Sequence, residues 1–210
     1  LFNLRRMLMN KSFIIKIILL CLVTIKVYAI EKVILFGDSL MAGYGLPNEQ
    51  HLSVVLQNKL ELEGHNIQII NGSVSGSTSA GGLNIAEWTL SETDIDLMVL
   101  CLGANDMLRG IDPKETKNNL EEIIKIAKNK NIKVIIAGMI APTSYGFSYK
   151  INFDKIFSQL SKKYKIHLIP FLLEGVAQKP EFNLSDGMHP NDQGTIIISN
   201  TIKKAILKNL

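Results

Sequence analysis

Short apolar runs alternate along this chain with segments in which apolar residues return every three or four positions. Five runs that are apolar on both faces are typical of strands in a parallel sheet covered by helices; they span residues 32–36, 67–70, 97–102, 132–137 and 166–169. Alternation of strands and helices predicts right-handed β–α–β units. We therefore expect the α/β class, as a three-layer α/β/α sandwich around a five-stranded parallel sheet.

Segments with helical periodicity fill the intervals between the predicted strands, and two of them carry end signals. Gly64 follows the first, at a position where a left-handed residue commonly ends a helix. A later segment starts with Asp112, Pro113 and Glu115, residue types favoured at the N-cap, first and third helical positions. The four helices marked by apolar side chains lie around residues 52–60, 120–127, 153–164 and 198–206.

The composition is that of one globular domain. The chain has 210 residues, of which 47% are hydrophobic and 20% are charged. This balance excludes a disordered chain and a polytopic membrane protein. No internal repeat and no linker divides the chain. Because ligands of open α/β sheets bind beyond the carboxyl ends of the strands, we expect functional residues directly after the predicted strands.

The net charge of +4 is concentrated in the first 29 residues, which carry five basic residues and no acidic one. Removing those five positive charges from +4 leaves residues 30–210 with a net charge of −1. No basic surface that could bind phosphate groups remains, so nucleic acid is not expected as a partner.

Residues 1–29 have the layout of a secretory signal peptide. Basic residues come first, an apolar run spans 17–25, and Val27 and Ala29 occupy the positions that a signal peptidase reads. We predict cleavage after Ala29, which makes 30–210 the mature domain, periplasmic or secreted and without stable membrane insertion. An uncleaved membrane anchor and lipidation at Cys21 are the alternatives. Cys101, the other cysteine, lies in an apolar run and is expected in the core rather than as a nucleophile.

Four groups of small and polar residues hold candidate chemistry. Ser39 follows the first predicted strand, the loop 71–78 follows the second, and Asn105 follows the third. Asp186 and His189 stand three residues apart before the last helix. Each group also has a purely structural interpretation: a helix cap, a flexible loop, a turn residue, and a capping Asp beside a surface His.

Taken together, the four groups match one reaction. A serine nucleophile needs a base to take its proton, and the base needs a carboxylate to orient it. The tetrahedral intermediate needs hydrogen-bond donors around its oxyanion. The exposed N–H groups of a small-residue loop and the amide of an asparagine can supply these donors. This agreement predicts serine hydrolase chemistry at the carboxyl edge of the sheet.

The same residues make the chain resemble the SGNH hydrolase (GDSL-type) family, in particular its small bacterial thioesterase I, lysophospholipase and arylesterase members. The resemblance implies a flavodoxin-like strand order 2-1-3-4-5, with Ser39 as nucleophile, His189 as general base and Asp186 orienting it. It also implies an oxyanion hole made of the backbone N–H groups of Ser39 and Gly76 and the amide of Asn105. The motifs that carry the resemblance are Gly37-Asp38-Ser39-Leu40-x-x-Gly43-Tyr44, Gly76-x-Thr78, Gly103-x-Asn105-Asp106-x-Leu108-Arg109-Gly110, Tyr145-Gly146-x-x-Tyr149-x-x-x-Phe153 and Asp186-Gly187-x-His189-Pro190-Asn191.

The sequence therefore predicts an exported carboxylic-ester hydrolase that works through an acyl-enzyme on Ser39. The resemblance implies acyl esters, aryl esters, thioesters or lysophospholipids as small-molecule substrates. Met107, Leu108 and Ile111 either line an apolar acyl groove or pack within their loop. The chain has no metal-ligand spacing, dinucleotide fingerprint or phosphate loop, so we expect no metal and no cofactor. The enzyme is expected to be a monomer. A cell-wall or carbohydrate O-acetylesterase and a non-catalytic flavodoxin-like binding module are the alternatives.

Overall fold

The computed structural model describes residues 31–91 and 94–210, so the predicted signal peptide lies outside the described residues. Five strands form one sheet: β1 (Glu31–Gly37), β2 (Ile67–Asn71), β3 (Ile95–Cys101), β4 (Lys133–Ala137) and β5 (His167–Ile169). The strand order is β2-β1-β3-β4-β5 and every pairing is parallel. The predicted strand order is confirmed, and each strand end differs from its prediction by at most two residues.

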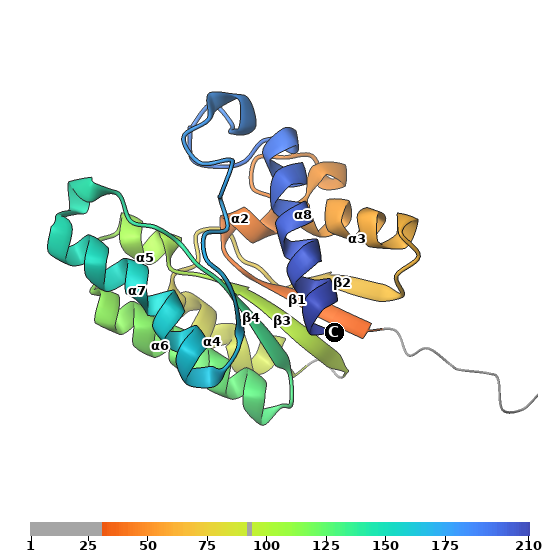
Figure 1. Cartoon of the computed structure of the whole chain (residues 1–210), viewed down its shortest axis with the longest axis horizontal. Coiled ribbons are helices and arrows are strands. Elements are labelled where there is room, and N and C mark those ends of the chain that lie inside the picture. Colours follow the sequence, from red (N-terminus) through yellow and green to blue (C-terminus); the bar gives the residue numbers. More distant parts are fainter. Residues whose placement is uncertain (1–30, 92–93) are drawn as a thin grey trace, which may run out of the picture.

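Helices cover both faces of this sheet. The α-helices are α2 (Ser39–Ala42), α3 (Leu52–Leu62), α4 (Ser79–Thr89), α5 (Ala104–Leu108), α6 (Pro113–Asn129), α7 (Phe147–Tyr164) and α8 (Asp192–Asn209); the 3-10 helices are η1 (Asn48–Gln50), η2 (Thr143–Tyr145) and η3 (Pro180–Phe182). α3 and α8 pack together on one face, while α4, α6 and α7 pack side by side on the other (Figure 1). This confirms the three-layer α/β/α architecture.

The predicted end signals act as expected. Asp112 caps α6, because its side chain accepts a hydrogen bond from the backbone N–H of Lys114 at 2.8 Å, and Pro113 is the first helical residue. Gly64 follows α3 with a φ of 77°, a left-handed conformation that side chains disfavour. No helix within residues 31–91 and 94–210 is long and apolar enough to cross a membrane.

The core lies between the sheet and the two helix layers, and β3 forms its centre. The side chains of residues 97–101 are fully buried. Cys101 is among them, which confirms it as a core residue. Burial, together with the nearby Asp38 carboxylate, raises the pKa of the Cys101 thiol. A protonated, inaccessible thiol is a poor nucleophile, so the chemistry of this protein lies elsewhere.

Candidate active site

β1 is the strand at which the sheet changes its direction of growth, since β2 joins one side of β1 and β3 joins the other. Such a switch point opens a crevice beyond the carboxyl ends of the strands. The register pairs Gly37 at the end of β1 with Cys101 at the end of β3. Ser39 and Asn105 follow these two ends within a few residues, so the fold places both at the crevice.

The turn from β1 into α2 needs a glycine. A Cβ atom at Gly37 would lie 2.6 Å from the backbone oxygen of Cys101 and 2.8 Å from Cγ of Met41. The bare backbone lets the chain enter α2 at once, with Asp38 as the N-cap and Ser39 as the first helical residue. The interpretation of Ser39 as a helix cap is therefore wrong.

Ser39, His189 and Asp186 form one chain of hydrogen bonds, although 150 positions separate the serine from the histidine. Ser39 Oγ lies 2.9 Å from Nε2 of His189, and Nδ1 of the same ring lies 2.6 Å from Oδ2 of Asp186. With the ring proton on Nδ1, the imidazole donates to the carboxylate and accepts from the Ser39 hydroxyl. This arrangement can remove the serine proton while the serine oxygen attacks a carbonyl carbon.

The loop before α8 prepares Asp186 as an acceptor. Its Oδ1 accepts hydrogen bonds from the backbone N–H groups of Met188 at 2.9 Å and His189 at 3.0 Å, which leaves Oδ2 for the imidazole. Burial by itself raises the pKa of Asp186, but these backbone bonds and the bond and charge of His189 outweigh it and lower the pKa to about 2. Asp186 is thus ionised at neutral pH and can stabilise a protonated His189.

The ring of Tyr44 packs against the imidazole ring of His189. The ring centroids of Tyr44 and His189 are 4.5 Å apart, and the ring planes meet at 39°. Tyr44 belongs to the loop directly after α2, the helix that starts at Ser39. The same short segment therefore carries both the serine and a ring that packs against His189.

The expected oxyanion donors lie on three segments, α2, the loop after β2 and α5, and a hydrogen bond links the last two. Asn105 lines the same cavity as Ser39 and His189. Arg109, which follows α5, donates a hydrogen bond to the backbone oxygen of Gly76 at 3.0 Å and so links the loop after β2 to the helix that carries Asn105. In the described part of the chain, the backbone N–H groups of Ser39 and Gly76 donate no hydrogen bond. Both groups can therefore donate to an anionic oxygen.

A fully buried carboxylate, Asp106, anchors α5. Its Oδ2 accepts from the backbone N–H of Ser79 at 2.7 Å, and its Oδ1 accepts from the hydroxyls of Ser79 and Thr116. Ser79 is the first residue of α4, where the positive end of the helix dipole favours an anion. Asp106 therefore fixes α5, and with it Asn105, to α4 and α6.

A cavity of about 950 Å³ opens beside Ser39 and His189. Its walls come from α2, α5, the β4–α7 loop, α7 and the β5–α8 loop. Its large apolar side chains are Leu40, Met107, Leu108, Met139, Ile140, Phe171, Leu173 and Met188. Met107 and Leu108 line the cavity, as the acyl-groove interpretation expects. Ile111 does not line it; its backbone oxygen instead accepts a hydrogen bond from the Tyr149 hydroxyl at 3.0 Å. The structure therefore does not place Ile111 in the predicted acyl groove.

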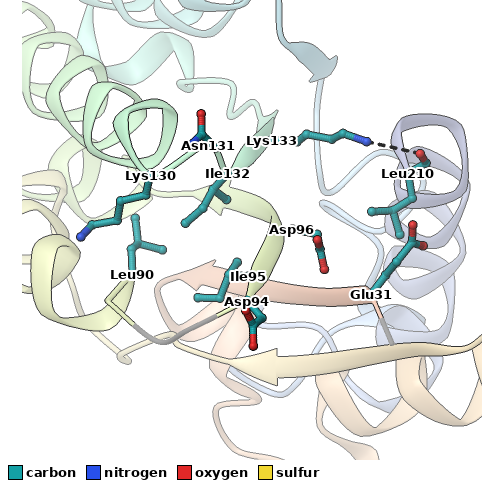
Figure 2. A pocket seen from close by; sticks show the side chains of 10 residues that line it. All are labelled: Glu31, Leu90, Asp94, Ile95, Asp96, Lys130, Asn131, Ile132, Lys133 and Leu210. Atoms are coloured by element: carbon teal, nitrogen blue, oxygen red, sulfur yellow. Dashed lines mark hydrogen bonds between the residues drawn. The ribbon is translucent and has the colours of Figure 1, made fainter. Parts of the chain in front are cut away.

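A second cavity, of about 400 Å³, lies at the opposite edge, where β1 and β3 begin (Figure 2). Lys133 there donates a hydrogen bond to the backbone oxygen of Leu210 at 3.3 Å. None of its lining residues is a serine, histidine or cysteine. Residues 31–91 and 94–210 also contain no group of three or more His, Cys, Asp or Glu side chains that could hold a metal ion. The candidate active site is the larger cavity at the carboxyl edge.

The profile of the GDSL-like lipase/acylhydrolase family matches residues 35–195, a range that contains Ser39, Gly76, Asn105 and His189. The chain belongs to this family. It is 36% identical over 182 residues to an arylesterase of Vibrio mimicus, covering 87% of this chain and 91% of that one. It is 30% identical over 187 residues to the thioesterase 1/protease 1/lysophospholipase L1 of Escherichia coli, covering 89% of this chain and 88% of that one.

The solved structure of TesA superposes on this hydrolase with a TM-score of 0.81 at 32% identity, covering 86% of this chain and 100% of that one. The protein is thus a carboxylic-ester hydrolase with the SGNH fold, and its substrate is a small-molecule ester. The alternative of a non-catalytic binding module is wrong.

Four residues shape the site without having been assigned a role from the sequence: Asp38, Tyr44, Asp106 and Arg109. All four lie inside the motifs that carry the family resemblance. Their positions beside Ser39 and Asn105 are the signal that could have singled them out. Each also has a partner on a distant segment, which could not be read from the sequence: in the same order, these partners are Asn105, His189, Ser79 and Gly76.

Proposed function

We propose that this hydrolase cleaves acyl esters and thioesters through an acyl-enzyme on Ser39. The observation that carries the proposal is the unbroken chain of hydrogen bonds from Ser39 through His189 to Asp186, of which Ser39 and His189 line a largely apolar cavity. A carboxylate, an imidazole and a hydroxyl in this order are the parts that nucleophilic acyl transfer requires.

The reaction proceeds in two halves. Ser39 Oγ attacks the carbonyl carbon, its proton passes to Nε2 of His189, and the carbonyl oxygen becomes an oxyanion. The backbone N–H groups of Ser39 and Gly76 and the amide of Asn105 are the donors that we assign to this oxyanion. The alcohol or thiol then leaves with the proton of His189. In the second half His189 takes a proton from a water molecule, whose oxygen attacks the acyl carbon. The bond between that carbon and Ser39 Oγ then breaks, His189 returns the proton to Oγ, and the acid is released.

Ser39→Ala tests the nucleophile. Hydrolysis of a p-nitrophenyl ester should fall by about 10³-fold or more, because the covalent route is lost. A fluorophosphonate probe should add one mass increment to the native protein and none to the variant. Ser148→Ala, which removes an exposed serine hydroxyl on α7, is the control and should keep both activity and labelling. Near-native activity in well-folded Ser39→Ala would show that another group is the nucleophile.

Asn105→Ala and Asp186→Ala test the two charges of the transition state one at a time. Asn105→Ala removes a donor to the oxyanion, and Asp186→Ala removes the carboxylate that stabilises the protonated imidazole. Each should lower kcat more than KM, and loss of one oxyanion donor costs about 10²–10³ in kcat. Asp186→Ala should also label slowly with the probe, and raising the pH should restore part of its activity, because deprotonation of Ser39 then depends less on His189. Higher pH cannot replace a missing donor in Asn105→Ala. A kcat for Asn105→Ala within about threefold of the native value at every pH would leave Asn105 as a turn residue only.

The apolar cavity favours substrates with an acyl chain over acetyl esters. Each buried CH₂ group is worth about 0.8 kcal/mol, so octanoyl esters should exceed acetyl esters in kcat/KM by about tenfold or more. A panel of p-nitrophenyl esters, acyl-thioesters and lysophospholipids measures this preference. The reverse order, with acetyl esters preferred, would instead support a carbohydrate or cell-wall O-acetylesterase.

The proposal extends to the compartment. The layout of residues 1–29 supports export to the periplasm or the medium, with a mature, monomeric enzyme that begins at Ile30. Intact-mass measurement of the exported protein, combined with light scattering, tests both points. A mature protein that keeps residues 1–29 would support an anchor, and a stable dimer would contradict the monomer.

A further inference from the structure

Asp38 is a fully buried carboxylate beside the serine, and the reaction as described gives it no role. Its Oδ1 accepts the hydrogen bond from the backbone N–H of Leu40 at 3.1 Å that caps α2. Its Oδ2 accepts a hydrogen bond from Nδ2 of Asn105 at 3.3 Å. A serine or threonine can also cap a helix, and neither would bury a charge. Helix capping therefore does not explain why this position carries a carboxylate, whose Oδ2 is bound by Asn105.

The two ends of an asparagine amide differ in chemistry. Nδ2 donates two hydrogen bonds and Oδ1 only accepts, yet the two ends have nearly the same shape. An ionised carboxylate can only accept, so Asp38 selects the rotamer of Asn105 that turns Nδ2 toward it. One amide hydrogen is then used by Asp38, and the other remains for a ligand in the cavity that Asn105 lines. The opposite rotamer would present Oδ1 to the substrate and repel an oxyanion.

From this geometry we infer that Asp38 is a positioning residue, which holds the amide of Asn105 with its donor end toward the reacting carbonyl oxygen. The inference rests on the proposed function, in which Asn105 donates to the oxyanion. Asp38 acts on Asn105 as Asp186 acts on His189: in both cases an acceptor-only carboxylate selects one of two orientations of a side chain. The site thus holds two carboxylates, one for each developing charge.

The titratable groups that face Asp38 are His189 from the loop before α8, Asp106 from α5 and Cys101 at the end of β3. Burial raises the pKa of Asp38 to about 6, against the opposing effects of the bonds from Leu40 and Asn105 and of His189, while Asp106 adds to the rise. A protonated Asp38 can donate to Oδ1 of Asn105 and so permit the repelling rotamer. The advantage that Asp38 gives to catalysis should therefore fade as the pH drops through this range.

Asp38→Asn tests the inference, because it changes one of the two contacts and keeps the other. The new Oδ1 can still accept from the N–H of Leu40, whereas an amide nitrogen now faces Nδ2 of Asn105. We expect kcat for a p-nitrophenyl ester to fall by about 10²-fold at pH 7.5 with KM changed less than about threefold, the pattern of a lost oxyanion donor. Asp38→Ser, which keeps a helix cap and leaves Asn105 without this partner, should lower kcat by a smaller factor.

A double-mutant cycle separates positioning from a general structural effect. In the Asn105→Ala background, Asp38→Asn should change kcat by less than about threefold, because its target is absent. The ratio of wild-type to Asp38→Asn kcat values should also shrink by about fivefold or more between pH 7.5 and about pH 5, as wild-type Asp38 becomes protonated. Equal losses in both backgrounds, or a constant ratio across this pH range, would overturn the inference.

The same experiments distinguish failure of this inference from failure of the proposed function. If wild type hydrolyses the ester, Ser39→Ala abolishes hydrolysis and Asn105→Ala reduces it, but Asp38→Asn matches wild type, only the positioning role of Asp38 is wrong. If Asn105→Ala itself has no effect, the proposed oxyanion hole is wrong, and the inference falls with it.

Discussion

Replacing Asp38 by Asn should make the protein more stable at neutral pH while making it a slower enzyme. The Asp38 carboxyl ionises at about 6 in the folded protein, against an ordinary value of 3.8. At about 1.36 kcal/mol for each pKa unit, the buried charge costs about 3 kcal/mol of folding free energy at pH 7. Asn removes the charge and keeps the cap of α2. Losing the hydrogen bond from Asn105 costs about 1 kcal/mol of stability, so the variant should gain about 1–2 kcal/mol in free energy of unfolding.

The pH dependence has a defined sign. Because the folded protein binds this proton more tightly than the unfolded chain does, ionised Asp38 lowers stability above about pH 6. The penalty is relieved as the pH falls from about 6 to about 4, and Asp38→Asn has no such term. Urea unfolding at pH 7 and at pH 4.5 should therefore show the variant more stable at pH 7 and the difference largely gone at pH 4.5.

Asp112→Asn, at the exposed cap of α6, is the matched control for this measurement. Its side chain still caps the helix, so its stability should stay within about 0.5 kcal/mol of wild type at both pH values. An Asp38→Asn variant that is less stable than wild type at pH 7 would refute the reasoning, because the carboxylate would then stabilise the fold. A difference between the two proteins that does not narrow toward pH 4.5 would refute it as well.

Two further predictions concern the segment that carries Asn105. Asp106→Ala leaves the donors of Ser79 and Thr116 without their buried acceptor, so urea unfolding should show the free energy of unfolding lower by about 2–5 kcal/mol. A decrease below about 1 kcal/mol would contradict the anchoring role of Asp106. Arg109→Met removes the hydrogen bond to Gly76 from an exposed position, so kcat should fall by about tenfold while Tm stays within about 2 °C of wild type. Arg109→Lys should recover part of the lost kcat. An unchanged kcat of Arg109→Met in steady-state assays would show that the Gly76 loop does not need this hydrogen bond.

Much of the fold could be predicted because it depends on local patterns. Runs that are apolar on both faces can only be satisfied inside a covered sheet, and the helix periodicity between them leaves the three-layer sandwich as the simple solution. Strong local signals, such as Asp112 before α6, set helix ends correctly. The short helices α2 and α5 were not predicted, since one or two turns show no periodicity. α4 was also missed, because Gly81 and Gly82 are poor helix formers in isolation.

The sequence by itself also determined which residues could do chemistry, since a serine and an asparagine followed predicted strands and an aspartate and a histidine preceded the last helix. Only the tertiary structure decided which of them meet. Ser39 and His189 form a hydrogen bond across 150 positions, and Asp38 meets Asn105 across 67. Ile111 is not among the residues that line the cavity, although Met107 and Leu108 nearby line it. Periodicity reports which face of an element is buried, whereas the pairing of side chains depends on how distant elements pack, and that information is not local to any segment.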